Sequence, residues 1–126
     1  MNFFDSFYKK DNDQEKMNFS LEVGPHTDLD TLPPVKDVYI TMLPGGDYKE
    51  TAEKAAALVK KGFNPVPHFP ARSINDEEQL KDYILRCKDV GTKQALVIGG
   101  SREPIGKFDS SIQILETGFF DGIKIG

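Results

Sequence analysis

The sequence predicts an α/β fold, namely a partial TIM (β/α)8 barrel with about four βα units and the start of a fifth strand. Short apolar runs alternate with segments of helical periodicity, which is typical of parallel strands joined by helical crossovers. Four of these runs end in a polar or glycine-rich group, and a barrel of this type collects its functional residues at the carboxyl ends of its strands.

The first elements are an amino-terminal segment and a short strand. Residues 1–17 are polar apart from four aromatic side chains, and we interpret them as an adapter rather than a functional site. A strand is predicted from Asn18 to Val23, because the run is compatible with β-structure and ends in the turn Gly24-Pro25. Leu29 and Leu32 then allow one helical turn.

The second unit contains the clearest helix. A strand rich in β-formers is predicted from about Asp37 to Met42, and the loop LPGGD ends it. Asp47 is the expected helix cap, with Glu50 three residues later as in a capping box. Apolar residues then recur at helical spacing until Gly62.

The remaining units repeat this pattern. Strands are predicted at about Asn64 to Phe69, Gln94 to Ile98 and Gly122 to Ile125. Between them we expect a helix that opens near Asn75 and stops at Gly91, and a shorter one capped by Asp109. The face of the first helix carries Leu80, Ile84 and Cys87, and that of the second carries Ile112 and Leu115. A doubly wound open sheet is the alternative, but EVGPHTD after the first strand lacks the glycine fingerprint of a dinucleotide-binding sheet and favours the barrel.

Size and composition limit the classes of function. The 126 residues suit one domain, 1–126, whereas a complete barrel needs about 250 residues, so we expect only the first half of one. A net charge of -4 with scattered basic residues argues against nucleic acid as a partner. No apolar run approaches the roughly 20 residues of a membrane span, and the amino terminus does not resemble a secretory signal, so a cytoplasmic protein is expected.

The single cysteine and the histidines bear on redox and metal chemistry. Cys87 has no disulfide partner, and its helical spacing indicates a small buried residue rather than a nucleophile. A metal site made of Glu22, His26 and His68 has no recognisable ligand spacing, and we predict none.

Two strand-end residues are candidates for chemistry. Glu22 would enter an apolar barrel mouth, where burial would raise its pKa and make it a general acid; the alternative is a surface glutamate or an ion-pair partner. His68 is stiffened by prolines on both sides, which suits a fixed contact to a planar or anionic ligand; the alternative is a satisfied histidine in the core.

The loop Gly99-Gly100-Ser101 is a weaker candidate. Glycines allow a ligand to approach the backbone closely, and amide groups there could hold a phosphate or a flavin edge. A double glycine also occurs at Gly45-Gly46, where an ordinary turn is the simpler interpretation.

Several long motifs resemble the methylenetetrahydrofolate reductase family, particularly its members that contain only the catalytic domain. The motifs are FSLEVGP, VYITMLPG, GFNPVPHFPARS, ALVIGGSREPIGKFDSS and ILETGFFDGIKIG, in that order. The resemblance runs from about Phe19 to Gly126 and covers the first half of the family's barrel. It implies FAD as cofactor, NAD(P)H as reductant and a folate substrate that is reduced from its methylene to its methyl form.

The resemblance also implies roles for individual residues. Glu22 matches the family's general acid, and Thr41 and His68 match flavin contacts. Gly99, Gly100 and Ser101 align with the loop after the fourth strand, where the family usually has an aspartate and this chain has serine. The loss of that negative charge puts folate affinity or specificity in question.

Two hypotheses therefore follow from the sequence. The first is a flavin-dependent reductase of which this chain supplies an incomplete barrel. The second is a non-catalytic half-barrel that binds a ligand or associates with itself or another chain, because the first and last strands of an open half-barrel would leave backbone groups unpaired.

Overall fold

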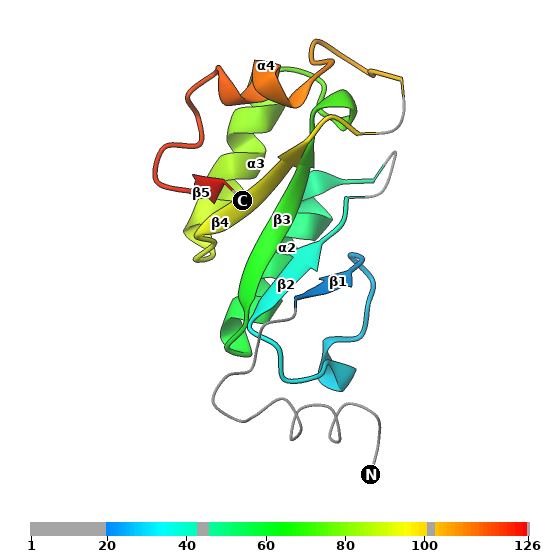
Figure 1. The fold of residues 1–126 in the computed structure, drawn as a ribbon, viewed down its shortest axis with the longest axis vertical. Helices are drawn as coiled ribbons and strands as arrows, with labels where there is room; N and C mark the ends of the chain where they lie inside the picture. The colour runs from blue at the N-terminus through cyan, green and yellow to red at the C-terminus, as the bar shows by residue number, and fades with distance from the viewer. Residues whose placement is uncertain (1–19, 43–45, 101–102, 126) are drawn as a thin grey trace.

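The computed structural model describes residues 20–42, 46–100 and 103–125, in which strands alternate with helical segments (Figure 1). The strands are β1 (Leu21–Val23), β2 (Asp37–Ile40), β3 (Asn64–Pro70), β4 (Gln94–Ile98) and β5 (Lys124–Ile125). The α-helices are α2 (Tyr48–Lys60), α3 (Glu77–Asp89) and α4 (Ser111–Leu115), and the 3-10 turns are η1 (Leu29–Thr31) and η2 (Ala71–Ser73). The adapter predicted at residues 1–17 lies outside the described residues.

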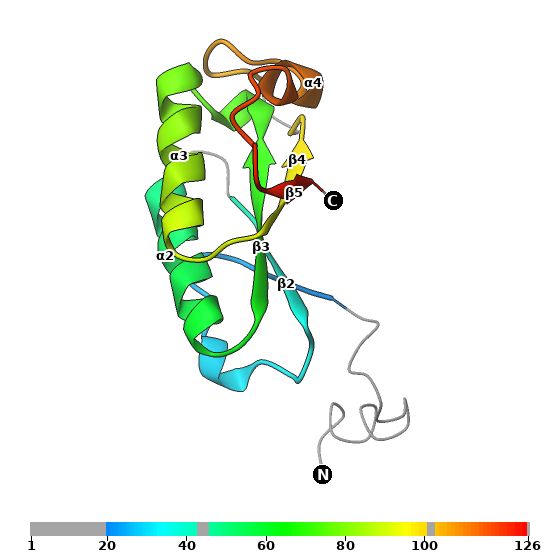
Figure 2. The same ribbon diagram turned by 90° about the vertical axis from the view of Figure 1, so that its left-hand side faces the viewer.

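The five strands form one parallel sheet in the order β1-β2-β3-β4-β5, so each strand pairs with the next strand along the chain. Helices α2 and α3 pack against one face of this sheet (Figure 2). Helix α4 lies beyond the carboxyl ends of β3 and β4 (Figure 1). The predicted α/β class with parallel strands is confirmed, and all five predicted strands are present with small differences in their bounds.

Alternation along the strands decides which side chains reach each face. In β2, Val38 and Ile40 are fully buried in a cluster with residues of α2, so Tyr39 between them projects from the opposite face. Paired residues of parallel strands project on the same side, and Tyr39 pairs with both Glu22 and Val66. We call the face that α2 and α3 leave uncovered the open face. Its side chains include Glu22, Tyr39, Val66, His68 and Leu96.

The face that α2 and α3 cover holds the hydrophobic core. Phe69 of β3 is fully buried and its ring stacks on that of Tyr83 in α3, with 4.0 Å between the ring centroids. Phe120 meets the same phenylalanine edge to face at 4.9 Å. Ala52 and Ala55 are the small residues of α2 in the buried clusters, and small side chains let a helix approach the sheet closely.

Helix ends follow the predicted chemistry, except that the capping box expected at α2 is not formed. Asp47 caps α2, but it accepts from the backbone N–H of Lys49 at 2.9 Å, while Glu50 lies beside His26 instead of completing a capping box. Helix α3 starts at Glu77 with Asp76 as its N-cap, close to the predicted opening near Asn75. The aspartate carboxylate accepts from the N–H of the residue at the third helical position, whereas the asparagine N–H is held by a glutamine side chain.

The prediction for α4 was wrong in its cap and in its buried face. Ser110 caps the helix together with Gln113, because the carboxylate of Asp109 is bonded to Arg72 instead. Ile112 is 64% exposed, and Ile114 is the fully buried residue of this short helix. A five-residue helix has less than two turns, so one residue can fill the contact that the sequence periodicity assigned to two.

The prediction that Cys87 is a small buried residue is confirmed. It lies in the core cluster, and burial raises the pKa of its thiol to about 12, so that the thiol stays protonated at neutral pH. Within the described ranges, none of the helices is long and apolar enough to cross a membrane.

Candidate functional site

The candidate site lies on the open face near the carboxyl ends of the first three strands. Glu22 is the middle residue of β1, and His68 lies two residues beyond Val66, the β3 residue on the same level as Glu22. The imidazole Nε2 of His68 lies 3.6 Å from the carboxylate Oε2 of Glu22. The two residues that the sequence singled out most strongly are therefore brought together from strands 46 positions apart along the chain.

Burial distinguishes the two members of this pair. The Glu22 side chain is 63% exposed, so the buried barrel mouth expected around it is not provided by the described residues. His68 is only 8% exposed, and this burial lowers the pKa of its imidazole, with the nearby Glu22 carboxylate opposing the shift. A neutral imidazole beside an exposed carboxylate is the resulting state at pH 7.

The His68 Nε2 atom is buried and has no hydrogen-bond partner among the described residues. Its 3.6 Å separation from Glu22 is longer than a hydrogen bond. Buried polar atoms in folded proteins are nearly always paired, so an unpaired one calls for an explanation such as a bound group or water. The interpretation of His68 as a satisfied core histidine is therefore not supported.

Tyr39 is a member of the site that the sequence reasoning missed. Its ring lies edge-on to the His68 ring, with 6.2 Å between centroids and an interplanar angle of 71°. The position was detectable in principle, because Tyr39 and Thr41 alternate with the buried aliphatic residues of β2 and so project on the same face. The aromatic wall limits the orientations of the imidazole.

Thr41 follows directly after β2 and connects the first two strands. Its hydroxyl donates to the carbonyl oxygen of Val23 at 3.1 Å, and its backbone N–H donates to the same oxygen at 2.9 Å. Both bonds anchor the end of β2 to the end of β1. Since Ile40 pairs with Pro67, Thr41 comes next to His68 on the neighbouring strand.

The loop after β4 approaches the end of β3 through backbone contacts. The N–H of Arg72 donates to the carbonyl of Gly99 at 3.0 Å. Gly100 has a φ of 97°, which favours glycine, whereas a Cβ there would make only an ordinary contact with the Cβ of Pro70 at 3.5 Å. Ser101, the third residue predicted in this loop, lies outside the described residues.

Arg72 binds the loop after β4 through both its side chain and its backbone. Its Nε donates to the backbone oxygen of Asp109 at 2.9 Å and to that residue's carboxylate at 3.1 Å. Its carbonyl accepts from the N–H of Ile105 at 3.1 Å. The sequence reasoning did not identify Arg72, although it stands in the motif PVPHFPARS. The loop after β4 is thus fastened to η2.

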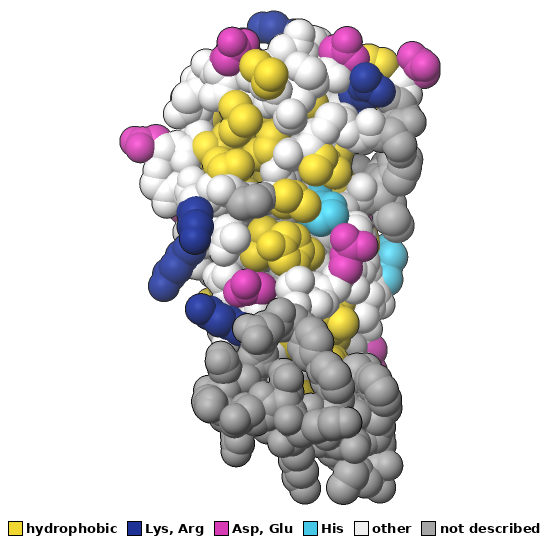
Figure 3. All heavy atoms as spheres, viewed as in Figure 1, with side chains coloured by type: hydrophobic (Ala, Val, Ile, Leu, Met, Phe, Trp, Pro, Cys, Tyr) yellow, Lys and Arg dark blue, Asp and Glu magenta, His cyan; other side chains and the backbone are white. Residues whose placement is uncertain are grey.

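The open face combines these polar groups with apolar surroundings. Figure 3 shows a histidine and an acidic side chain side by side within a band of hydrophobic side chains on this face. Leu96, which pairs with His68, and Ile98 at the end of β4 are half-buried there. Such a surface suits a flat, largely apolar ligand with a few polar atoms at its edge.

His26 does not join the site. Its Nε2 lies 3.5 Å from the Glu50 carboxylate of α2, and its side chain is 78% exposed. Across residues 20–42, 46–100 and 103–125, no three histidine, cysteine or acidic side chains are grouped so that they could hold a metal ion. The groups that the described strand ends bring together are the Glu22 carboxyl group and the His68 imidazole.

A comparison with models of known protein families found no match to this chain.

Proposed function

We propose that this chain supplies part of the active-site wall of a flavin-dependent reductase that converts 5,10-methylenetetrahydrofolate to 5-methyltetrahydrofolate with NAD(P)H as reductant. The observation that carries the proposal is the buried His68 Nε2 without a partner, 3.6 Å from the exposed carboxylate of Glu22. The sequence motifs that resemble methylenetetrahydrofolate reductases run through the same strand ends and give this pair its assignment.

The sheet supports a barrel wall as the setting. Doubly wound sheets reverse their strand order at a switch point and carry helices on both faces. Here the order is sequential, and both long helices lie on one face (Figure 2). In a (β/α)8 barrel the strands follow in sequence with helices outside and functional residues at the carboxyl ends, so the open face corresponds to the barrel interior.

The residues at this end suit the edge of a flavin ring. His68 offers a neutral imidazole whose Nε2 has no partner among the described residues, and Leu96 gives an apolar surface next to it. Thr41 offers a hydroxyl oxygen that already donates its proton to Val23 and retains lone pairs for a ligand donor. Gly99 and Gly100 leave room for close approach to the backbone. When bound, FAD would accept a hydride from the nicotinamide and deliver it to the folate.

Glu22 is proposed as the general acid toward the folate. Its exposed carboxyl group can meet a substrate that covers the open face, and substrate binding would remove it from water. Desolvation by the substrate would then favour the protonated carboxyl group that a general acid requires. His68 at 3.6 Å limits where the carboxyl group rests before it gives its proton to the substrate.

The test is to purify the chain, measure FAD binding by absorbance and fluorescence, and assay NAD(P)H oxidation with methylenetetrahydrofolate. Glu22→Gln should abolish folate reduction and leave FAD binding intact, whereas Glu53→Gln, an exposed position on α2, should leave both unchanged. Full activity of Glu22→Gln would remove Glu22 from the mechanism. Absence of FAD binding in the unaltered chain would count against the proposal as a whole.

A second candidate is a non-catalytic half-barrel that associates with itself. Among the described residues, β1 and β5 each pair with one neighbouring strand only, and Ile125 of β5 is 39% exposed. Unpaired strand edges favour addition of another strand. A flavin-free dimer in light scattering would favour this candidate, and a folded monomer that binds FAD would favour the reductase.

A further inference from the structure

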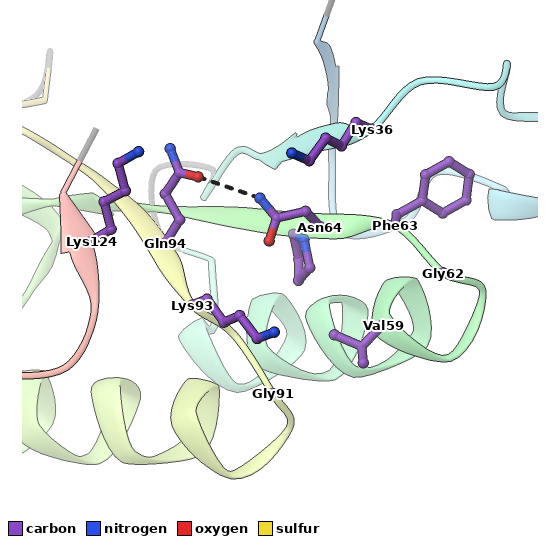
Figure 4. Close-up of a pocket in the computed structure, with 10 residues that line it drawn as sticks. Lys36, Val59, Gly62, Phe63, Asn64, Gly91, Lys93, Gln94 and Lys124 are labelled. Carbon is purple, nitrogen blue, oxygen red and sulfur yellow. Dashed lines mark hydrogen bonds between the residues drawn. The ribbon is translucent and has the colours of Figure 1, made fainter. Parts of the chain in front are cut away.

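A cavity of about 480 Å³ lies at the end of the sheet opposite to Glu22 and His68. Its strand residues are the first residues of their strands, Asn64 of β3, Gln94 of β4 and Lys124 of β5, with Pro65 next to the first of them. The turns after α2 and α3 close one side (Figure 4). The volume is in the range of sites for small ligands.

Among the described residues that line this cavity, three are lysines and none is acidic. They are Lys36, Lys93 and Lys124. Backbone bonds fix the positions from which they start: the N–H of Asn64 donates to the carbonyl of Lys36, and the N–H of Lys124 donates to the carbonyl of Lys93, both at 2.9 Å. In a chain with a net charge of -4, three lysines line one cavity, Lys36 and Lys124 on one side of β3 and Lys93 on the helix side (Figure 4).

The three lysines form no ion pairs with other described residues. The ion pairs found there use the other cations Lys61, Lys107, Arg72 and Arg86 and the two histidines. The acidic residue nearest in register is Asp37, whose carboxylate accepts from the Asn64 side-chain amide at 3.0 Å. Its carboxylate is therefore engaged by an amide group at the edge of the cavity.

Amide groups complete the lining. The Asn64 amide also donates to the Gln94 side-chain oxygen at 3.3 Å, so this oxygen is already occupied. Figure 4 shows the dashed contact between the two amides, with the nitrogen end of Gln94 turned outward from it and the Lys36 side chain nearby. Since the Gln94 oxygen accepts this bond, the NH2 group of Gln94 can donate hydrogen bonds to a ligand near the lysines.

We propose that this cavity binds a small polyanion that carries phosphate groups. Lysine ammonium groups act as point charges with freely rotating donors, which suits tetrahedral phosphate oxygens. The site is independent of the reductase proposal, because it lies at the amino-terminal ends of the strands and shares no residue with the Glu22 and His68 end.

The test uses pyrophosphate as the probe at constant ionic strength. Calorimetry on the full chain should show saturable binding, and the double variant Lys36→Gln and Lys124→Gln should weaken it at least about tenfold, since each lysine supplies a charged contact. Lys49→Gln, an exposed charge at the start of α2 outside the cavity, should bind within about twofold of the unaltered chain.

Nuclear magnetic resonance then locates the site without depending on the variants. Pyrophosphate should shift the side-chain NH2 signals of Asn64 and Gln94 and leave those of Asn75 and Gln113 unchanged. Equal weakening by Lys49→Gln, shifts spread over the whole surface, or the absence of saturable binding would each overturn the proposal. Loss of pyrophosphate binding would leave the FAD and folate assays unaffected.

Discussion

Two neighbouring residues of β3 show how differently the two faces of the sheet are used. Phe69 projects toward α3 and is enclosed by the rings of Tyr83 and Phe120. His68 projects from the open face and is nearly as buried, yet its Nε2 has no hydrogen-bond partner within the described part of the chain. Packing encloses the Phe69 ring, whereas the imidazole keeps a buried polar atom without a partner; the Thr92 hydroxyl, in the turn between α3 and β4, is the other such side-chain atom among the described residues.

This difference makes the open face the better candidate for ligand binding, whereas the face covered by α2 and α3 contributes to stability through packing. Polar atoms that are buried without partners cost free energy, and native proteins keep few of them. A face that retains one, next to an exposed carboxylate, is the expected location of a ligand site. The comparison makes four predictions, which we give from the largest expected effect to the smallest.

Removal of the aromatic ring on the helix side should have the largest effect. Phe69→Ala should reduce the free energy of unfolding by about 3–5 kcal/mol, because it leaves a cavity between Tyr83 and Phe120. Leu96→Ala on the open face should cost about 1 kcal/mol, since that side chain is already partly exposed. Urea denaturation measures both, and equal losses would contradict the division between the faces.

The hydrogen bond between the side chain of Tyr83 in α3 and the backbone of His68 in β3 should contribute less to stability than the Phe69 ring. The buried hydroxyl of Tyr83 donates to the carbonyl of His68 at 2.7 Å, and burial raises the pKa of this phenol well above its usual value, so it stays a donor. Tyr83→Phe keeps the stacked ring and should cost about 1 kcal/mol in thermal or urea unfolding. The hydroxyl of Tyr48 donates to the partly exposed Asp82, so Tyr48→Phe should cost less. A larger loss for Tyr48→Phe than for Tyr83→Phe would contradict the stabilising role of the bond between Tyr83 and β3.

Acid should destabilise the fold through His68. Burial lowers the imidazole pKa in the folded state, so near pH 6 the unfolded chain binds more protons and stability falls as pH decreases from about 7.5 to 5.5. His68→Gln should show a shallower decline over that range than the unaltered chain, measured by urea unfolding at each pH. His26→Gln removes the exposed histidine and should keep the original slope; if it flattens the curve as much, the assignment to His68 is wrong.

The smallest effect should come from the exposed partner of the histidine. Glu22→Gln removes the carboxylate that opposes the shift, so the pKa of His68 should decrease further, as followed by the imidazole signals in an NMR titration. Stability at neutral pH should change by less than about 0.5 kcal/mol because Glu22 is exposed. With Glu53→Gln as the control, an unchanged His68 pKa in Glu22→Gln would show that the two groups do not interact.

Most of the fold was predictable because its determinants are local. The strands at Gln94 and Asn64 and the helix after Asp47 follow from short-range periodicity, breakers and capping residues. The cap predicted for α4 was wrong, since Asp109 is taken by Arg72, a residue 37 positions away along the chain, although Ser110 and Gln113 have the spacing of a capping box. Sequence periodicity does not reveal such long-range competition for one carboxylate.

The candidate site was predictable in its members and less so in its environment. Strand ends place Glu22, Thr41 and His68 near one another, because parallel strands bring their carboxyl ends to one edge. The exposure of Glu22 and the edge-on ring of Tyr39 depend on what packs across the sheet, which the sequence pattern of a single strand does not contain. The roles proposed for these residues remain predictions for the flavin and folate assays.

The sequential order of the strands also bears on how the protein folds. Among the described strands, each later strand pairs with the one synthesised just before it, and none inserts between two earlier ones. Each pairing closes a single crossover, the smallest separation that parallel strands allow, although parallel pairing is itself slow compared with the formation of local helical contacts. We therefore expect the sheet to form by addition of one strand and its helix at a time as the polypeptide leaves the ribosome. In this order, β1 and β2 become covered once α2 has formed.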